Sequence, residues 1–357
     1  MTRLERIAWI AAGIGLLAVV VLWLLEPTRM PYAWLAGFTT FSLWPLGSLA
    51  LLFAHSLTGG RWGEALRPAL LLGASLTPVL ILLAIPVVLT LPILYSWARP
   101  EGATLANRFW LTIPFYAVRG GLSLAIWTAL SFVVRRAPRR TPSYPVTPGL
   151  DPGVQAEGRR GATGLTRIAP FALILLAITV TTEAIDSTMS LDPHFTSSAY
   201  GMIAAASAGV FALACAILAS PPAPPEINGE IGRLLLGLTI LWTYLDFMQL
   251  LIVWQNDLVT QTPWYLARAH GPAGVAMAAV SLLHSVVPFF ALLAPRIRKS
   301  RLGLSAVASV LIVAEIIRNF WTVLPSAPSG AWLPAIACIV LMASATKAWT
   351  LRRMRHE

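Results

Sequence analysis

The sequence predicts an all-α integral membrane protein with about ten transmembrane helices. Its 357 residues are 57% hydrophobic and only 11% charged, with a mean hydropathy of +0.72. So little polar surface could not cover a water-soluble globule of this size. The apolar residues also form long runs, and the basic residues occur in short clusters between those runs. Helices are expected because each run is too long for a strand and lipid offers no partner for unpaired backbone groups.

Ten stretches contain the roughly 20 apolar residues that a helix needs to cross a bilayer. Their limits are residues 7–25, 33–57, 68–96, 108–134, 167–190, 198–219, 231–254, 270–294, 302–324 and 331–351. Prolines inside these spans, such as Pro78, Pro86 and Pro114, predict kinks rather than breaks. The first run follows Arg3 and Arg6 as a signal peptide would, but Glu26-Pro27-Thr28-Arg29 replaces a cleavage site. A retained first helix is therefore expected.

The basic residues predict the orientation of the chain. With ten spans both termini share one side, and that side collects 20 of the 26 Lys and Arg residues. Because cytoplasmic loops carry the excess of positive charge, both termini are expected in the cytoplasm. The longest connection, residues 135–166, contains five prolines, five glycines and six arginines. This composition cannot bury enough apolar area to fold alone and predicts a cytoplasmic linker.

Several ionisable residues fall near the middle of the predicted spans, where a charge costs about 2.5–3.5 kcal/mol even on the lenient insertion scale. They are Arg119, Glu183, Asp246, His284 and Glu315. Three further polar residues lie one helical turn from members of this set and so share a helix face with them: Asp186, Gln249 and Arg318.

Two interpretations of these groups stay open. They could be buried ion pairs that only fix helix packing, for example Arg119 with Glu183. They could instead form a chain of protonatable sites, with the two arginines as charge partners. The relay candidates are then Glu183, Asp186, Asp246, His284 and Glu315, and the charge partners are Arg119 and Arg318. A ligand or quinone pocket is a third interpretation.

Four residues are candidates for the periplasmic or quinone side: Asp192, His194, Gln249 and Asp257. For Asp192, His194 and Asp257, a helix cap or loop turn is the competing interpretation. The segment Thr58-Gly59-Gly60-Arg61-Trp62 predicts a helix stop and an interfacial turn rather than a phosphate site.

The residue inventory argues against several cofactors and partners. Of the five histidines only His284 is central, so no bis-histidine haem is expected. The two cysteines, Cys215 and Cys338, cannot hold an iron–sulfur cluster or another metal and are interpreted as packing residues. No nucleic-acid partner is expected, because the basic residues lie between apolar runs and not along one solvated face.

A set of short motifs occurs in a fixed order between residue 47 and about residue 290. They are Gly47-Ser48-Leu49-Ala50-Leu51-Leu52 through His55, Leu57-Thr58-Gly59-Gly60-Arg61-Trp62-Gly63, Pro114-Phe115-Tyr116 with Arg119, Asp186 through Met189-Ser190-Leu191-Asp192-Pro193-His194, Trp242-Thr243-Tyr244 with Gln249 and Trp254, Pro263-Trp264-Tyr265, and His284 with Pro288-Phe289. Together they resemble the integral membrane subunits of alternative complex III (ActF-like), a bacterial quinol:electron-acceptor oxidoreductase. These subunits belong to the NrfD/polysulfide-reductase membrane-anchor superfamily.

The resemblance implies two four-helix bundles, formed by spans two to five and six to nine, with spans one and ten peripheral. The corresponding divisions are residues 1–30, then 31–134 with 167–197, then 198–325, and finally 326–357. Arg119, Glu183 and Asp186 would belong to the first bundle, and Asp246, His284, Glu315 and Arg318 to the second.

The implied function is that of a non-haem subunit in a quinol-oxidising complex of the bacterial inner membrane. Such a subunit binds quinone or conducts protons and has no redox centre of its own. Haem and iron–sulfur subunits and a second membrane subunit would be its partners. The competing functions are a proton-coupled secondary transporter and a structural scaffold. Helix interruptions at matching places in the two halves would favour the transporter, and the sequence shows no clear matching pair.

Overall fold

The computed structural model describes residues 2–100, 109–137 and 164–356, and within these ranges all regular elements are helices. Nine of these helical segments are long and apolar enough to cross a membrane, and a bent helix pair brings the number to ten. The uninterrupted spans are α1 (Arg3–Leu25), α2 (Met30–Thr58), α6 (Ile113–Arg136), α8 (Gly164–Ser187), α9 (Tyr200–Ala219), α10 (Pro225–Asn256), α15 (Arg301–Val323) and α16 (Trp332–His356). The all-α, multi-span fold class is therefore confirmed. Most of the predicted linker, residues 138–163, lies outside the described residues.

The third predicted span, residues 68–96, is not one helix. It consists of α3 (Arg61–Ala74) and α4 (Val79–Leu89), which meet at an angle of 43°. Pro78 lies at the break, as the residue before α4. The hydroxyls of Ser75 and Thr77 donate hydrogen bonds to the carbonyls of Leu72 and Ala74. Pro78 thus produces a break and not the expected kink, because it offers no N–H to continue the hydrogen-bond ladder. Pro114 lies in the first turn of α6, where proline causes no kink at all.

The eighth span contains a wide turn in its middle. It runs through α12 (Gly271–Val280), a π-helical turn at Ser281–Val286 and α13 (Val287–Leu293). Pro288 cannot donate to the carbonyl one turn earlier, that of His284, which loosens the ladder at this level. Short helices complete the connections: α5 (Leu91–Leu94), α11 (Thr262–Leu266) and α14 (Pro295–Lys299).

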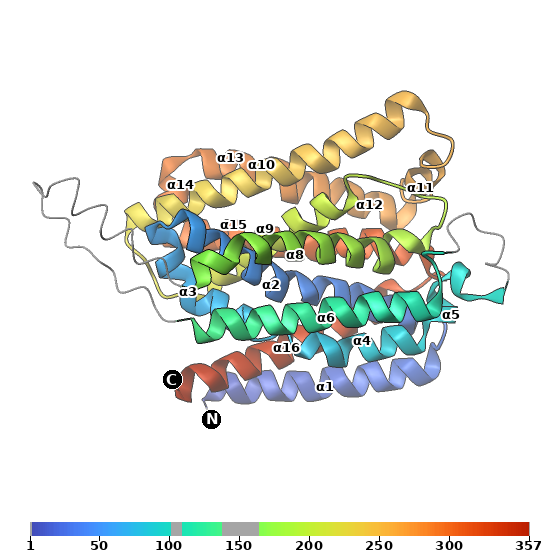
Figure 1. Ribbon diagram of the computed structural model, residues 1–357, viewed down its shortest axis with the longest axis horizontal. Helices are drawn as coiled ribbons and strands as arrows, with labels where there is room; N and C mark the ends of the chain where they lie inside the picture. Colours follow the sequence, from blue (N-terminus) through green and yellow to red (C-terminus); the bar gives the residue numbers. More distant parts are fainter. Residues whose placement is uncertain (1, 101–108, 138–163, 357) are drawn as a thin grey trace, which may run out of the picture.

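The long helices lie alongside one another (Figure 1), and their contacts define two rings of four. In the first ring α2, α3 with α4, α6 and α8 contact one another in turn, and in the second α9, α10, α12 with α13, and α15 do so. The rings join mainly where α2 packs on α9, and α1 lies outside them against α16. This is the arrangement of two four-helix bundles with peripheral first and last spans.

Close approach of α2 and α9 depends on a glycine. A Cβ added at Gly47 would lie 1.8 Å from the carbonyl oxygen of Ala208. No side chain therefore fits at this position. The turn at residues 58–62 ends α2 as predicted, because Gly59 and Gly60 adopt positive φ values of 69° and 104°.

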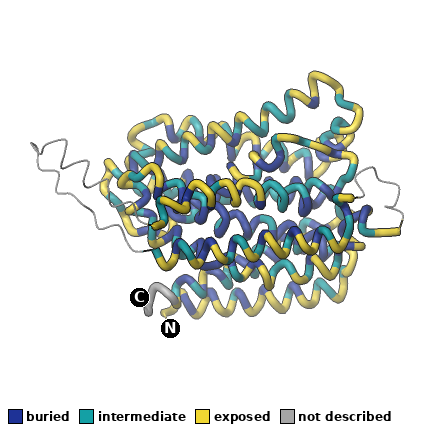
Figure 2. Tube along the Cα trace, viewed as in Figure 1, coloured by how far each residue is buried: buried dark blue, intermediate teal, exposed yellow. Residues whose placement is uncertain are grey.

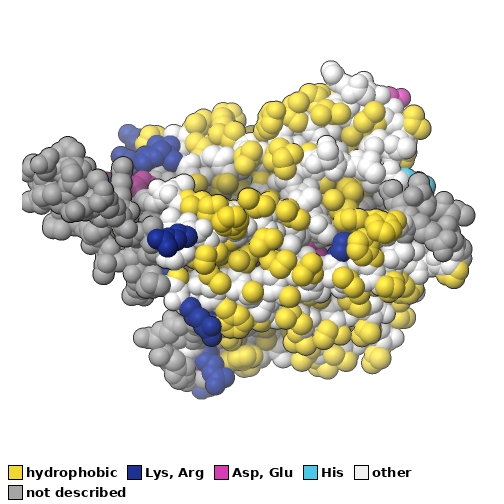
Figure 3. Space-filling model, in the orientation of Figure 1, with side chains coloured by type: hydrophobic (Ala, Val, Ile, Leu, Met, Phe, Trp, Pro, Cys, Tyr) yellow, Lys and Arg dark blue, Asp and Glu magenta, His cyan; other side chains and the backbone are white. Residues whose placement is uncertain are grey.

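The outside of the molecule divides into an apolar girdle and a basic end. Exposed hydrophobic side chains cover the middle of the face in Figure 3, while α2 lies in the buried interior (Figure 2). Most of the Lys and Arg side chains visible on that face gather at the end where both termini lie. An ion pair between Arg61 and Glu230 ties α3 to α10 at this end. This is the surface expected of a protein that spans a bilayer.

Candidate functional site

The first polar cluster is a closed ion pair between Arg119 on α6 and Asp186 on α8. The guanidinium donates from Nε and Nη2 to the two carboxylate oxygens, each at 2.8 Å. Trp110 donates from its indole N–H to Asp186 at 2.9 Å and accepts from Arg119 Nη1 through its carbonyl. The guanidinium also lies 4.1 Å from the Trp110 ring centroid and 4.3 Å from that of Phe115. Both charged side chains are buried. Their hydrogen bonds to each other and to Trp110 give nearly every polar atom of the pair a partner.

Arg119 therefore pairs with Asp186 and not with Glu183, the partner offered as an example from the sequence. Glu183 lies one turn earlier on the same helix, and its carboxylate accepts a hydrogen bond from Ser187 Oγ. No ion pair to Glu183 is present among the described residues. The two acidic residues of α8 thus differ: one is locked by an arginine, and the other faces open space.

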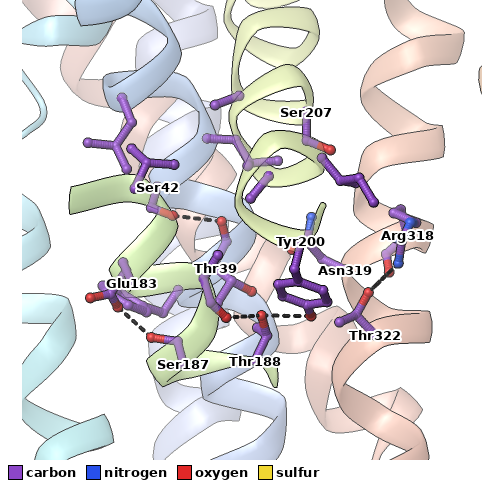
Figure 4. A pocket seen from close by; sticks show the side chains of 18 residues that line it. Thr39, Ser42, Glu183, Ser187, Thr188, Tyr200, Ser207, Arg318, Asn319 and Thr322 are labelled. Atoms are coloured by element: carbon purple, nitrogen blue, oxygen red, sulfur yellow. Dashed lines mark hydrogen bonds between the residues drawn. The ribbon is translucent and has the colours of Figure 1, made fainter. Parts of the chain in front are cut away.

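That open space is a cavity of about 90 Å³ between the two bundles, formed by α2, α8, α9 and α15. Glu183 lies on one wall and Arg318 on the opposite wall (Figure 4). The side chains of Tyr200, Thr188 and Asn319 lie between them, and the Tyr200 hydroxyl donates to Thr188 Oγ1 at 2.9 Å. A cavity of this size and polarity has room for several water molecules. It joins the polar groups of one bundle to those of the other.

On the far wall, Arg318 of α15 forms an ion pair with Asp246 of α10. Its Nη2 donates to Asp246 at 2.6 Å, and its Nη1 donates to Thr322 at 2.6 Å. The Arg318 side chain is 11% exposed and that of Asp246 is 32% exposed. The pair therefore reaches from the cavity wall toward the outer surface of α10.

The most deeply buried ionisable pair is formed by His284 and Glu315, whose side chains are both 0% exposed. His284 Nε2 lies 2.8 Å from Glu315 Oε1, and the imidazole stacks on Trp242 with ring centroids 3.7 Å apart. The π-helical turn supplies His284, which places the ring between α10 and α15. His284 Nδ1 and Glu315 Oε2 have no hydrogen-bond partner among the described residues. Such buried polar atoms require a partner such as water.

Of the four residues predicted at the other end of the spans, Asp192, His194 and Asp257 lie in turns or caps, whereas Gln249 lies inside α10. Asp192 accepts from the backbone N–H of His194 at 3.1 Å, and His194 is exposed. Asp257 ends α10 with a left-handed backbone conformation, φ 43° and ψ 50°, and is exposed. Gln249 accepts a hydrogen bond of 2.5 Å from Ser197. These four residues do not join the central cluster.

Sequence reasoning missed Arg268, which lies in the connection between α11 and α12 and is only 3% exposed. It donates to the carbonyls of Trp264 and Thr322 and to Ser326 Oγ, each at 3.1 Å. Its guanidinium lies 3.8 Å from the Trp264 ring centroid. Desolvation lowers the pKa of Arg268 to about 10, so the side chain stays charged at neutral pH. The sequence contains no signal for this burial, because an arginine in a short connection between helices is ordinarily expected to be exposed to solvent.

Comparison with known proteins gives no family for this chain. No protein-family model matches the sequence, and no curated protein matches it at a significant level.

Chemically, the site combines three ionisable pairs with one carboxyl group, that of Glu183, which has no ion-pair partner among the described residues and lies at a polar cavity. The pairs are Arg119–Asp186, Arg318–Asp246 and His284–Glu315. Glu183 also borders a second space, an apolar groove of about 320 Å³ between α4, α6 and α8. A carboxyl group placed between an apolar groove and a polar cavity can accept a proton on one side and release it on the other.

Proposed function

We propose that this chain is a proton-conducting, non-haem membrane subunit of a quinol-oxidising respiratory complex of the alternative complex III type. It would lie in the bacterial inner membrane with its basic end and both termini in the cytoplasm. The excess of Lys and Arg on the side of the termini, 20 of 26, supports this orientation.

The cavity between the two bundles is the observation that supports proton conduction. It brings a carboxyl group, a tyrosine hydroxyl and an arginine from three different helices to one polar space. Water in that space would connect Glu183 with the neighbourhood of Arg318. A chain of this kind needs only groups that hold and release protons in turn, and no metal or cofactor.

The flanking ion pairs would have a supporting role in this proposal. Asp186 is held on both oxygens by Arg119 and so keeps Arg119 from pairing with Glu183. Glu183 is thereby left free to change its protonation state. On the second bundle, protonation of Asp246 would release Arg318 toward the cavity, where its charge would favour the ionised form of Glu183.

The His284–Glu315 pair offers a second proton-holding group further along α15. Its unpartnered atoms, Nδ1 and Oε2, are the positions through which a proton would arrive and leave. Asn319 lines the cavity and donates to the backbone carbonyl of Glu315 at 2.9 Å, so this pair lies one helical turn from the cavity wall.

The respiratory part of the proposal depends on the ordered motifs between residues 47 and 290. Haem and iron–sulfur subunits and a second membrane subunit would be the partners, and electrons would pass through them. The groove between α4, α6 and α8 adds support for contact with quinone. It is lined largely by aliphatic side chains, ends at Glu183 and Tyr116, and is large enough to admit a lipid-soluble ring.

Two helix interruptions bear on the competing transporter function. The first bundle is broken in its second span, between α3 and α4, whereas the second bundle has its π-helical turn in its third span. Inverted-repeat transporters interrupt corresponding helices of their two halves. The interruptions in the described residues do not correspond, which favours the respiratory subunit.

The proposal is tested by quinol oxidation in the assembled complex. Glu183→Gln and Glu315→Gln each preserve side-chain shape but remove a proton-holding group. We expect a loss of turnover of at least about a hundredfold in each, the lower end of what a lost proton-transfer group costs. Glu64→Gln, at an exposed position of α3, is the matched control and should keep wild-type turnover.

Purification in mild detergent tests the assembly separately. Haem and iron–sulfur proteins that co-purify with the chain support the complex. A solitary chain that carries a substrate across vesicles would contradict it in favour of the transporter.

A further inference from the structure

Another groove lies on the lipid-facing surface, apart from the polar cavity and from the groove between α4, α6 and α8. It has a volume of about 460 Å³ and is formed by α2, α9, α15 and α16, with a contribution from Leu72 of α3. Its walls are mostly aliphatic and aromatic, for example Phe41, Phe211, Leu218 and Ile312. The exposure of Leu218, 42%, and of Ala343 shows that the groove opens to the outside of the helix bundle. It is therefore a lipid-accessible trough and not an internal cavity.

The groove runs along α16 and changes in character from one end to the other. On this helix it extends from Ile339 to Leu351, a rise of about 18 Å for an α-helix. The end at Ile339 is apolar, and the end near the C-terminus contains Thr346, Lys347 and Thr350. This second end lies at the basic end of the molecule, where Arg301 donates to the carbonyls of Ile217 and Ser220 beside the groove.

Lys347 is the one charged side chain among the described residues that line this groove. It is exposed, and no carboxylate of the described residues lies within ion-pair distance of it. The hydroxyls of Thr346 and Thr350 donate to backbone carbonyls of α16, so their oxygens keep only acceptor capacity. The ammonium group is thus the unpaired donor at the headgroup end of the trough.

We propose that this groove binds one anionic phospholipid, with an acyl chain along the aliphatic walls and the phosphate headgroup at Lys347. An acyl chain gains little by leaving bulk lipid for an apolar groove, because both surroundings are equally apolar. Selection among lipids must therefore come from the headgroup. A single Lys near the membrane surface favours an anionic headgroup about fivefold, equivalent to ~1 kcal/mol.

A neighbouring groove provides an internal comparison. It has a volume of about 530 Å³, lies between α1, α2, α4 and α16, and contains no charged side chain among its described lining residues. Thr346 and Met342 border both grooves, so the two share a wall. The neighbouring groove therefore has no charged group among these residues to hold a headgroup, and lipid in it should be lost on transfer to detergent.

The test is lipid retention by the full chain in nanodiscs that contain equal amounts of phosphatidylglycerol and phosphatidylcholine, measured by native mass spectrometry after transfer to detergent. Wild type should retain one phosphatidylglycerol. Lys347→Gln should lower the preference for phosphatidylglycerol about fivefold, and Lys347→Arg should preserve it. Arg352→Gln, at an exposed residue of the same basic end that does not line the groove, should leave the preference unchanged.

A second pair of variants assigns the lipid to this groove. Ala343→Trp fills the groove and should abolish retention, whereas Ala345→Trp enters the neighbouring groove and should not. Retention that survives Ala343→Trp, or an unchanged headgroup preference in Lys347→Gln, would overturn the proposal. Recovery of a neutral lipid or a quinone from the groove in wild type would overturn it as well.

Discussion

Removal of the Arg119 side chain should strongly destabilise the first bundle. The variant Arg119→Met keeps the bulk of the side chain but leaves Asp186, which is 2% exposed, as a buried carboxylate without its partner. Three hydrogen bonds end on that carboxylate, and two of them come from Arg119. Loss of one member of a buried ion pair costs about 3–5 kcal/mol. We expect a decrease of this size in the free energy of unfolding.

The double variant Arg119→Met/Asp186→Leu separates the cost of the orphaned charge from the loss of packing. Replacement of both partners by apolar side chains removes the buried charge, so most of the stability should return. Unfolding in mixed micelles with increasing denaturing detergent, followed by circular dichroism, measures both variants. If Arg119→Met alone loses less than about 1 kcal/mol, or the double variant is as unstable as the single one, this description of the pair is wrong.

Variants at two further positions, Gly47 and Arg268, test the packing. Gly47→Ala should lower the free energy of unfolding by about 1–3 kcal/mol, because its Cβ would overlap the carbonyl of Ala208. Gly120→Ala is the control: a Cβ there has no neighbouring atom within 4 Å, so this variant should be neutral or stabilising in the same unfolding assay. Arg268→Met should lower the free energy of unfolding by about 2–5 kcal/mol, since it leaves the carbonyl of Thr322 without its guanidinium donor. Faster proteolysis in the connection between α11 and α12 would report the loosened loop. Unchanged stability and cleavage would contradict the role assigned to Arg268.

The fold follows from the sequence because lipid imposes simple rules. Apolar runs of about 20 residues can only be helices in a bilayer, and the clusters of basic residues mark mainly those ends of the runs that lie on the side of the termini. The break between α3 and α4 was not predicted, since a proline inside an apolar run, such as Pro78, does not indicate whether the helix bends or stops there. The structure shows that side-chain hydrogen bonds accompany the break at Pro78, because the Ser75 and Thr77 hydroxyls donate to the carbonyls of Leu72 and Ala74.

The central polar residues could be found from the sequence, but their pairing could not. Helix periodicity places Glu183 and Asp186 on neighbouring positions of one face, yet the rotation of α8 against α6 decides which of them meets Arg119. Trp110, which precedes α6, completes that choice. The cavity depends on side chains from four helices, so no single-helix pattern reveals it. For the same reason burial of Arg268 is visible only after the connecting loop packs on α15.

The most direct test of the account counts the protons that Glu183 helps to move. The assembled complex is placed in vesicles with a pH-sensitive dye, and the protons taken up per electron are measured for wild type, Glu183→Gln and the control Glu64→Gln. We expect Glu183→Gln to lower the number of protons per electron while the chain stays assembled, and Glu64→Gln to leave it unchanged. An unchanged number in Glu183→Gln would show that the cavity between the two bundles is not a route for protons.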